Sequence, residues 1–287
     1  MKKIIAPFVL LLSIHCAQHE ASPLEQLAKL PKGMKEISGI AYHHRLLYSI
    51  EDSGNENEVT VMNTSGTIVN RIAILHTPNV DWEDLTFDTQ GNLYIGDFGN
   101  NDNTRRDLAI YKIDRADLKG SQANVAYTLT FDYPEQTEFP PKKNHLLFDV
   151  EAFLAYQNDF YLFTKNRSKG FDGTSYIYKI PNTPGHHHAQ FVKKITTCTD
   201  YHHCAITSAS ISPDASRFVL LSHSKLWLFT NYTPGNLTDG RMTELNLNHY
   251  SQKEALCFKN NDTLLIADER VKNTGGNLYQ VSLKALK

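Results

Sequence analysis

The chain has 287 residues, a length at which all-β sandwiches, barrels and similar closed β folds still form one domain with a full-sized core. Lys and Arg number 29 and Asp and Glu number 31, so the net charge of −2 provides no basic field for a nucleic-acid backbone. With 41% hydrophobic residues, 14 Tyr and 14 Phe, the composition is too apolar for intrinsic disorder. We therefore expect one globular domain that does not bind nucleic acid.

The N-terminal segment has the features of an export signal. Lys2 and Lys3 precede an apolar run over residues 4–14, which is too short to span a bilayer but suits the core of a signal peptide. We expect residues 1–17 to be the signal peptide and residues 24–287 to form a single domain. The protein is then exported, and is periplasmic, secreted or tethered to the cell envelope.

Cys16 offers an alternative to simple cleavage, because it could be the lipidated residue of a bacterial lipoprotein. His15 is a poor match to the small residue that such sites require before the cysteine. No later segment approaches the roughly 20 apolar residues of a membrane helix, so we expect no membrane span.

Short runs of alternating apolar residues recur along the rest of the chain, and each opens with an acidic or hydroxyl residue. The five runs are SGIAY from Ser38, EDLTF from Glu83, EAFLAY from Glu151, TSASI from Thr207 and EALCF from Glu254. Their starts lie about 45 to 70 residues apart, close to or above the span of a four-stranded propeller blade. Second and third β-rich runs follow each opening run, and turn-forming segments such as DTQGN and SPDAS separate them.

This recurrence predicts an all-β fold, a five-bladed β-propeller. Fourth strands are expected at residues 68–74, 125–131, 190–196 and 242–247. The last unit lacks a fourth strand, and residues 24–30 would supply it and close the ring, which removes the exposed edges of a linear array. A β-sandwich and a six-bladed propeller, with one blade hidden between residues 83 and 150, stay open as alternatives.

The cysteines support an oxidising compartment. Cys198 and Cys204 enclose the short segment TDYHH, and such a pair most simply forms a disulfide. The alternative is a zinc site with His202 and His203, although adjacent histidines rarely both reach one metal. Cys257 lies in an apolar run and is expected to be an inert buried thiol.

Other features carry less functional information. The histidine run at 186–188 follows a Pro-Gly turn and is expected to form an exposed loop, and Trp82 is expected to pack between blades. No GxSxG elbow, P-loop or HExxH motif occurs, so those mechanisms lack their starting residues.

The residues that open the five runs are candidate metal ligands. In a propeller the first strand of each blade lines the central channel, so these residues should face the axis near one end. Three of them are carboxylates, which would repel one another without a cation. Calcium suits such a site because it takes roughly six to eight oxygens in a flexible geometry, and the absence of His and Cys argues against zinc. We therefore predict a Ca²⁺ site formed by Ser38, Glu83, Glu151, Thr207 and Glu254.

The order of these residues resembles the soluble calcium-activated nucleotidases, the apyrase family, whose members are five-bladed propellers with one calcium ion in the channel. LYSIEDSGN at 47–55 is similar to an acidic segment of that family and places Asp52 at a catalytic acidic position. FYLFTKNRS at 160–168 is similar to the family's basic segment, with Lys165 and Arg167 near its arginines. The chain has no counterpart to the family's nucleotide-base contacts.

The resemblance implies calcium-dependent hydrolysis of nucleotide or other phosphate esters. In that reaction Lys165 and Arg167 would stabilise the charge of the transition state, and Asp52 would position or deprotonate the attacking water. From the residues alone, Asp52 also suits a turn, and the basic pair suits a solvated loop. The alternative function is a non-catalytic propeller with structural calcium, whose loops bind a protein or glycan partner.

Overall fold

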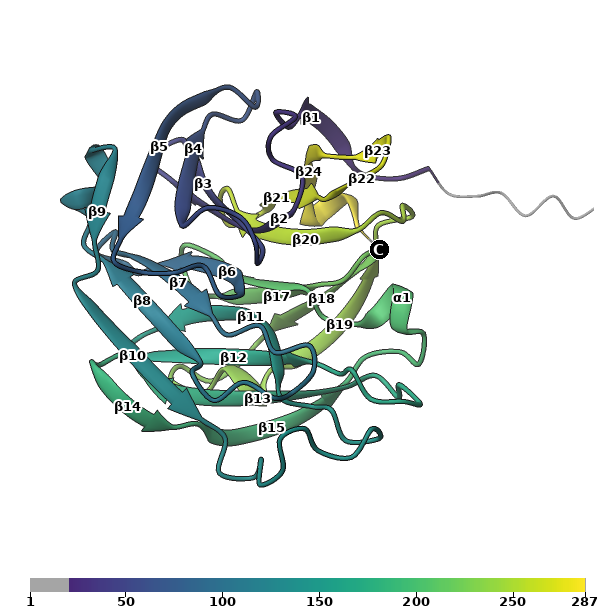
Figure 1. Cartoon of the computed structure of the whole chain (residues 1–287). Helices are drawn as coiled ribbons and strands as arrows, with labels where there is room; N and C mark the ends of the chain where they lie inside the picture. The colour runs from purple at the N-terminus through teal and green to yellow at the C-terminus, as the bar shows by residue number, and fades with distance from the viewer. Residues whose placement is uncertain (1–20, 287) are drawn as a thin grey trace, which may run out of the picture.

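The computed structural model describes residues 21–286, which form five sheets arranged as the blades of a ring (Figure 1). The predicted signal peptide and Cys16 lie outside the described residues. No helix in the described part of the chain is long and apolar enough to cross a membrane.

Each blade is a four-stranded antiparallel sheet, and the first strand of each lies at the centre of the ring. Blade 1 consists of β2 (Ile37–His43), β3 (Leu46–Glu51), β4 (Glu58–Met62) and β5 (Ile68–Leu75). Blade 2 consists of β6 (Trp82–Phe87), β7 (Leu93–Asp97), β8 (Ala109–Ile113) and β10 (Tyr127–Asp132). Blade 3 consists of β11 (Asp149–Tyr156), β12 (Asp159–Lys165), β13 (Thr174–Pro181) and β15 (Gln190–Thr196).

Blade 4 consists of β16 (Ser208–Ile211), β17 (Arg217–Leu221), β18 (Lys225–Thr230) and β19 (Arg241–Asn246). Blade 5 consists of β20 (Lys253–Phe258), β21 (Thr263–Asp268), β24 (Asn277–Ser282) and β1 (Glu25–Lys29). The period-2 alternation of the predicted strands therefore corresponds to observed strands in every blade.

Short elements occupy the connections between strands. β9 (Gln122–Asn124) and β14 (Gly185–His188) each add to the outer edge of the preceding blade in parallel, on β5 and β10 respectively. The remaining elements are the hairpin of β22 (Arg270–Val271) and β23 (Thr274–Gly275), helix α1 (Tyr201–Cys204), and the 3₁₀ turns η1 (Asp117–Lys119), η2 (Leu237–Asp239) and η3 (Leu283–Ala285).

The core is divided among the interfaces between neighbouring blades. Each of the five buried apolar clusters combines side chains of two adjacent blades. The rings of Phe98 and Phe153 pack edge to face across the blade 2–blade 3 interface with their centroids 5.2 Å apart. Trp82 is fully buried in the blade 1–blade 2 cluster, as expected for a residue that packs between blades.

The N-terminal strand closes the ring. β1 pairs antiparallel with β24 and supplies the fourth strand of the last blade, so purple and yellow ribbons lie side by side in Figure 1. Leu30 and Met34 then pack with Ala255 and Leu278 between blades 5 and 1.

The five-bladed prediction is confirmed. The six-bladed alternative is wrong, because residues 133–148 contain no strand, and so is the β-sandwich, because the sheets do not form two stacked layers.

The cysteine pair is bonded. Cys198 and Cys204 form a disulfide, which confirms that prediction and removes the zinc alternative for this pair. The bond fixes α1 to the end of blade 3. Cys257 is a buried free thiol on β20, as expected.

Candidate functional site at one mouth of the channel

The predicted ligands occupy one recurring backbone feature, a β-bulge in the innermost strand. In blades 1, 2, 3 and 5 the register skips a single residue of that strand. The skipped residues are Ser38, Glu83, Glu151 and Glu254. In blade 4, Thr207 precedes β16 and donates its N–H to Leu221 O (2.9 Å), the residue that pairs with Ser208. A bulge redirects one side chain out of the normal alternation, so each blade presents one polar side chain at this level.

The two hydroxyl residues connect blades. Ser38 Oγ donates to Trp82 O (2.8 Å), and Thr207 Oγ1 donates to Lys253 O (2.8 Å). Each accepting carbonyl belongs to the residue that precedes the glutamate of the next blade. The hydroxyl protons are therefore used in contacts between blades, and the calcium-ligand assignment of Ser38 and Thr207 stays a prediction.

Three carboxylates converge beside the bulge of blade 2. Oxygen atoms of Asp52, Asp81 and Glu83 lie within 4.8 Å of one another. Glu83 is 6% exposed, and among residues 21–286 no basic side chain forms an ion pair with any of the three. Asp52 follows β3, so the structure brings this predicted catalytic residue close to Glu83, a predicted calcium ligand. The third member, Asp81, was not predicted.

The surroundings of this cluster oppose its ionisation. Burial raises the pKa of Asp81 to about 7, and the neighbouring Asp52 carboxylate acts in the same direction. Burial also raises the pKa of Glu83 well above its usual value, with further contributions from Glu151 and Asp52. Such an arrangement favours either bound protons or a bound cation.

A glycine forms one wall of the cluster. A Cβ added at Gly99 would overlap with Oε1 of Glu83 and Oδ2 of Asp81. Gly99 also donates its N–H to Asp81 O (3.2 Å). Because residue 99 has no side chain, these carboxylate oxygens can lie against the backbone of the β7–β8 connection. The Cβ of any other residue would occupy their space.

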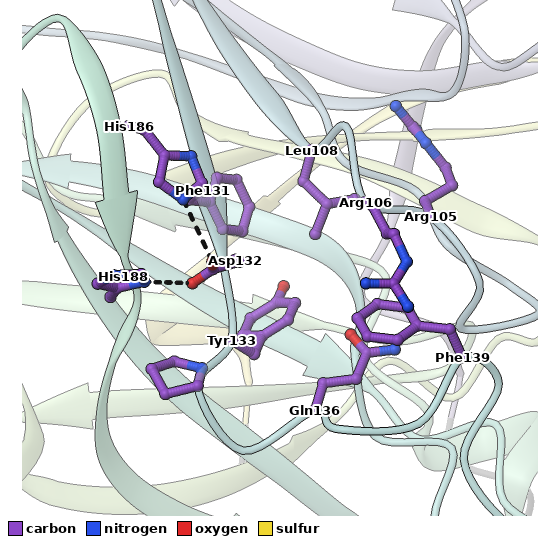
Figure 2. Close-up of a pocket in the computed structure, with 11 residues that line it drawn as sticks. Arg105, Arg106, Leu108, Phe131, Asp132, Tyr133, Gln136, Phe139, His186 and His188 are labelled. Carbon is purple, nitrogen blue, oxygen red and sulfur yellow. Dashed lines mark hydrogen bonds and ion pairs between the residues drawn. The ribbon is translucent and has the colours of Figure 1, made fainter.

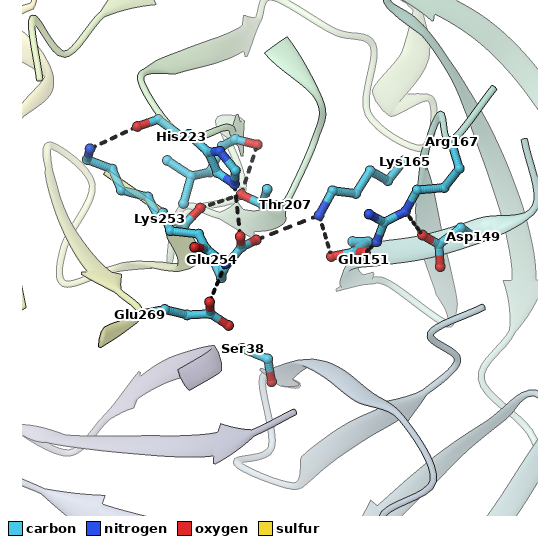
Figure 3. Close-up of polar contacts among 12 residues, drawn as sticks. Ser38, Asp149, Glu151, Lys165, Arg167, Thr207, His223, Lys253, Glu254 and Glu269 are labelled. Atoms are coloured by element: carbon cyan, nitrogen blue, oxygen red, sulfur yellow. Dashed lines mark hydrogen bonds and ion pairs between the residues drawn. The ribbon is translucent and has the colours of Figure 1, made fainter. Parts of the chain in front are cut away.

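The two basic residues of blade 3 that were predicted to stabilise the transition state, Lys165 and Arg167, form ion pairs with acidic residues. Lys165 Nζ lies 3.0 Å from Glu151 Oε2 and 3.9 Å from Glu254 Oε2 (Figure 3). Arg167 donates through Nε to Asp149 Oδ2 (2.6 Å) and through Nη2 to Glu151 Oε1. Burial acts to raise the pKa of Glu151, but Lys165 and Arg167 together lower it below its usual value. The expected solvated loop is absent here, because Lys165 is only 6% exposed.

Blade 5 adds two more acidic groups to the mouth. Glu254 Oε1 lies 2.9 Å from Nε2 of His223, which follows the second strand of blade 4. Glu269 follows the second strand of blade 5, and burial, together with Glu254 and Asp52, raises its pKa to about 8. Figure 3 shows Glu254 between Glu269 and the Lys165–Glu151 pair.

The five predicted ligands thus lie at one mouth but do not converge on one point. Glu83 belongs to the carboxylate cluster, Glu151 to the ion pairs with Lys165 and Arg167, and Glu254 lies between Lys165 and His223. The residues missed from the sequence are Asp81, Asp149, His223 and Glu269. Asp81 and Asp149 each lie two residues before a bulge residue, and His223 and Glu269 follow the second strands of blades 4 and 5 as Asp52 follows that of blade 1. These positions were the available signal.

The channel below the mouth is crossed by a further acid. Asp84 is fully buried, and its Oδ2 accepts hydrogen bonds from Phe153 N (3.3 Å), Ala209 N (3.4 Å) and Ser208 Oγ (3.3 Å). These partners belong to blades 3 and 4. Asp84 therefore connects three blades directly below the site.

Comparison with known proteins identifies no family for this chain. No protein-family model matches the chain, and no curated protein matches it. Among solved structures, a chain of a nidogen/laminin complex matches with 13% identity and a TM-score of 0.46, over 82% of this chain and 73% of that chain. The PQQ-bound aldose sugar dehydrogenase of Streptomyces coelicolor matches with 11% identity and a TM-score of 0.49, over 90% of this chain and 97% of that one. The apyrase resemblance stays an expectation of the sequence.

Proposed function

We propose that this chain is an exported protein that binds Ca²⁺ at the channel mouth through Asp52, Asp81 and Glu83, and that it hydrolyses a phosphate ester or anhydride there. The observation that carries the proposal is Glu83, a carboxylate more than nine-tenths buried that points into a cluster of two other acids with no basic partner among the described residues. A buried charge without a partner is costly, and a cation removes that cost.

The donor set selects the kind of cation. All three side chains offer oxygen, which suits a hard divalent ion such as calcium, whose remaining positions are taken by water and carbonyl oxygens. Asp52 is then a ligand, in place of the role of base that the resemblance implied.

The neighbouring ion pairs support phosphate chemistry. A bound divalent ion would neutralise phosphate oxygens and lower the pKa of an attacking water. Lys165 and Arg167 are held in fixed positions by Glu151 and Asp149, so they are arranged in advance to stabilise negative charge. Carboxylates outnumber fixed cations at the mouth, so a phosphate anion is repelled until the acidic cluster is neutralised. Turnover should therefore depend strictly on the divalent ion.

The disulfide supports the export part of the proposal. Cys198–Cys204 is compatible with an oxidising compartment, where such bonds persist. The periplasm, the medium and a lipid tether at Cys16 all satisfy this condition.

The test is phosphate release from a panel of nucleotides and other phosphoesters, with Ca²⁺, with Mg²⁺ and with a chelator. We expect turnover that needs Ca²⁺, that is lost in Glu83→Gln and Asp81→Asn, and that falls in Lys165→Met with calcium binding retained. Glu56→Gln, an exposed acid beyond β3, is the matched control and should keep full activity. Calcium binding without turnover on any substrate would overturn the hydrolase, and loss of turnover without loss of calcium binding in Glu83→Gln would overturn the ligand assignment.

A further inference from the structure

A second group of metal-ligand side chains lies on the outer edge of blade 2, away from the channel mouth. Asp132 Oδ1 is 2.6 Å from His188 Nδ1, and Asp132 Oδ2 is 3.2 Å from His186 Nε2 (Figure 2). One ligand atom from each of the three residues lies within 4.8 Å of the others. We propose that Asp132, His186 and His188 form a Zn²⁺ site.

The backbone, and not a flexible loop, brings these residues together. Residues 186–188, expected to form an exposed loop, belong to β14, which pairs in parallel with β10. His186 is opposite Thr130 and His188 is opposite Asp132, so both imidazoles project from the same face as the carboxylate. His-x-His on a strand with an acid on its neighbour is a donor set that suits zinc, since zinc accepts imidazole nitrogen and carboxylate oxygen at about 2.0–2.2 Å.

A contact between His186 and Thr130 supports the same conclusion. His186 uses Nε2 toward Asp132, and its other ring nitrogen, Nδ1, lies 3.1 Å from Thr130 Oγ1. Metal-binding histidines usually hold their second nitrogen in this way, which fixes the orientation of the ring. Thr130, on β10, would thus hold the His186 ring in the orientation that metal binding needs.

The ion pairs alone do not explain the cluster. The side chains of Asp132, His186 and His188 are 43%, 52% and 73% exposed, and ion pairs this exposed contribute little to stability. The nearby arginines have other partners, because Arg105 pairs with Asp97 and Arg106 stacks on Phe139 with the guanidinium 3.5 Å from the ring centroid. Among the described residues Asp132 therefore forms ion pairs only with His186 and His188, and its carboxylate can bind a metal ion together with their imidazoles.

The cluster borders a cavity of about 500 Å³, which gives a metal ion an entry path and room for water in its remaining position. Figure 2 shows Asp132 and His186 on one side of this cavity and Arg106, Gln136 and Phe139 on the other. Three protein ligands and one exchangeable position describe an open zinc site.

The chain itself contains a matched control. His187 lies between the two proposed ligands but is opposite Phe131, and its Nε2 contacts Thr183 O (2.9 Å) instead of Asp132. A general affinity of the histidine run for metals would involve His187, whereas the proposed site would not.

The experiment uses a chain that begins at residue 21, purified without a polyhistidine tag, in buffer with millimolar Ca²⁺ so that the channel mouth is filled. ZnCl₂ is titrated by calorimetry, and CoCl₂ is added as a spectroscopic probe of tetrahedral coordination. We expect one Zn²⁺ per chain and visible Co²⁺ bands that Zn²⁺ abolishes. His186→Ala, His188→Ala and Asp132→Asn should each weaken binding by more than about 100-fold, and Thr130→Val by about 10-fold.

His187→Ala and Glu83→Gln should leave Zn²⁺ affinity unchanged, the second because it belongs to the channel mouth. Equal losses in His187→Ala and His188→Ala would overturn the proposal in favour of a non-specific histidine run. Absence of a saturable Zn²⁺ site in the parent chain would overturn it outright.

Discussion

The ammonium group of Lys165 lies 3.0 Å from Oε2 of Glu151, and both side chains are more than nine-tenths buried. The pair joins the end of β12 to the bulge of β11 at the channel mouth. Glu151 therefore already has a cation beside it, whereas Glu83, its counterpart in blade 2, has none among the described residues. The acid of blade 3 at the mouth is therefore neutralised within the protein, whereas the acids beside Glu83 in blade 2 need an added cation.

Replacing Lys165 by Met should destabilise the fold even without any ligand. The change leaves the buried Glu151 carboxylate with Arg167 as its remaining partner, and breaking a buried pair costs about 3–5 kcal/mol. Urea denaturation of Lys165→Met, Glu151→Gln and the double variant measures this coupling. We expect the double variant to be more stable than the sum of the single changes predicts, and strict additivity would show that the pair is not coupled.

Replacing Glu83 by Gln should raise the melting temperature without calcium and lower it, relative to the parent, with calcium. In chelator the variant should melt at a higher temperature than the parent, because an unpartnered buried acid has been removed. With Ca²⁺ the order should reverse, since an ion at 100 times its Kd stabilises the native parent by about 2.7 kcal/mol. Thermal melts of both proteins in both buffers provide the comparison. Parallel calcium-induced shifts in the two proteins would argue against Glu83 as a ligand.

Gly99→Ala should impair the channel mouth selectively. Its Cβ would overlap with carboxylate oxygens of Glu83 and Asp81, so these side chains must move apart and calcium affinity should fall at least about 10-fold. Gly33→Ala is the matched control, because no atom beyond its two chain neighbours lies within 4 Å of the Cβ it would add. Calcium titration of the two variants separates them, and equal affinities would show that the wall at Gly99 has no role in the site.

The sequence predicted the fold well because each blade repeats the same local pattern. The alternation in runs such as EDLTF and EAFLAY marks the inner strands, and the missing fourth strand of the last blade pointed to residues 24–30. The same recurrence marked the bulge positions, because Ser38, Glu83 and Glu151 each open a run.

The pairing of the site residues could not be predicted in the same way. Each bulge turns its side chain in a direction set by the neighbouring blades, so equivalent residues acquired different partners. Glu151 meets Lys165, and Glu83 meets Asp81, which lies two residues before it in the β5–β6 connection. The strand β14 was missed because a four-residue GHHH segment has no hydrophobic alternation and exists only through its pairing with β10.

His43 should give the stability a measurable dependence on acid pH. Burial lowers its pKa, with additional effects of His44 and Arg115, while Asp88 acts in the opposite direction. Since the folded pKa lies below the unfolded value of about 6.5, the unfolded chain takes up this proton first, and stability falls as the pH drops below that value. His43→Phe retains the stacking on Phe87 and removes the titration. Urea midpoints between pH 7 and pH 5 should decline less steeply in the variant, and identical slopes would assign the effect to other groups.

The disulfide should stabilise the part of the mouth that carries Arg167. Arg167 donates through Nη1 to Tyr201 OH (2.8 Å), and Tyr201 begins the helix that Cys204 ends. Closing a loop with a sequence separation of 6 is worth about 2 kcal/mol in the chain-entropy account. We expect Cys198→Ala/Cys204→Ala to lower the free energy of unfolding by about that amount, and Tyr201→Phe alone to lower it much less.

Thiol titration tests the bond itself. In a chain that begins at residue 21, the native parent should show no reactive thiol before reduction, because Cys257 is buried, and two reactive thiols after reduction. A reactive thiol in the unreduced native protein would show that the bond does not form.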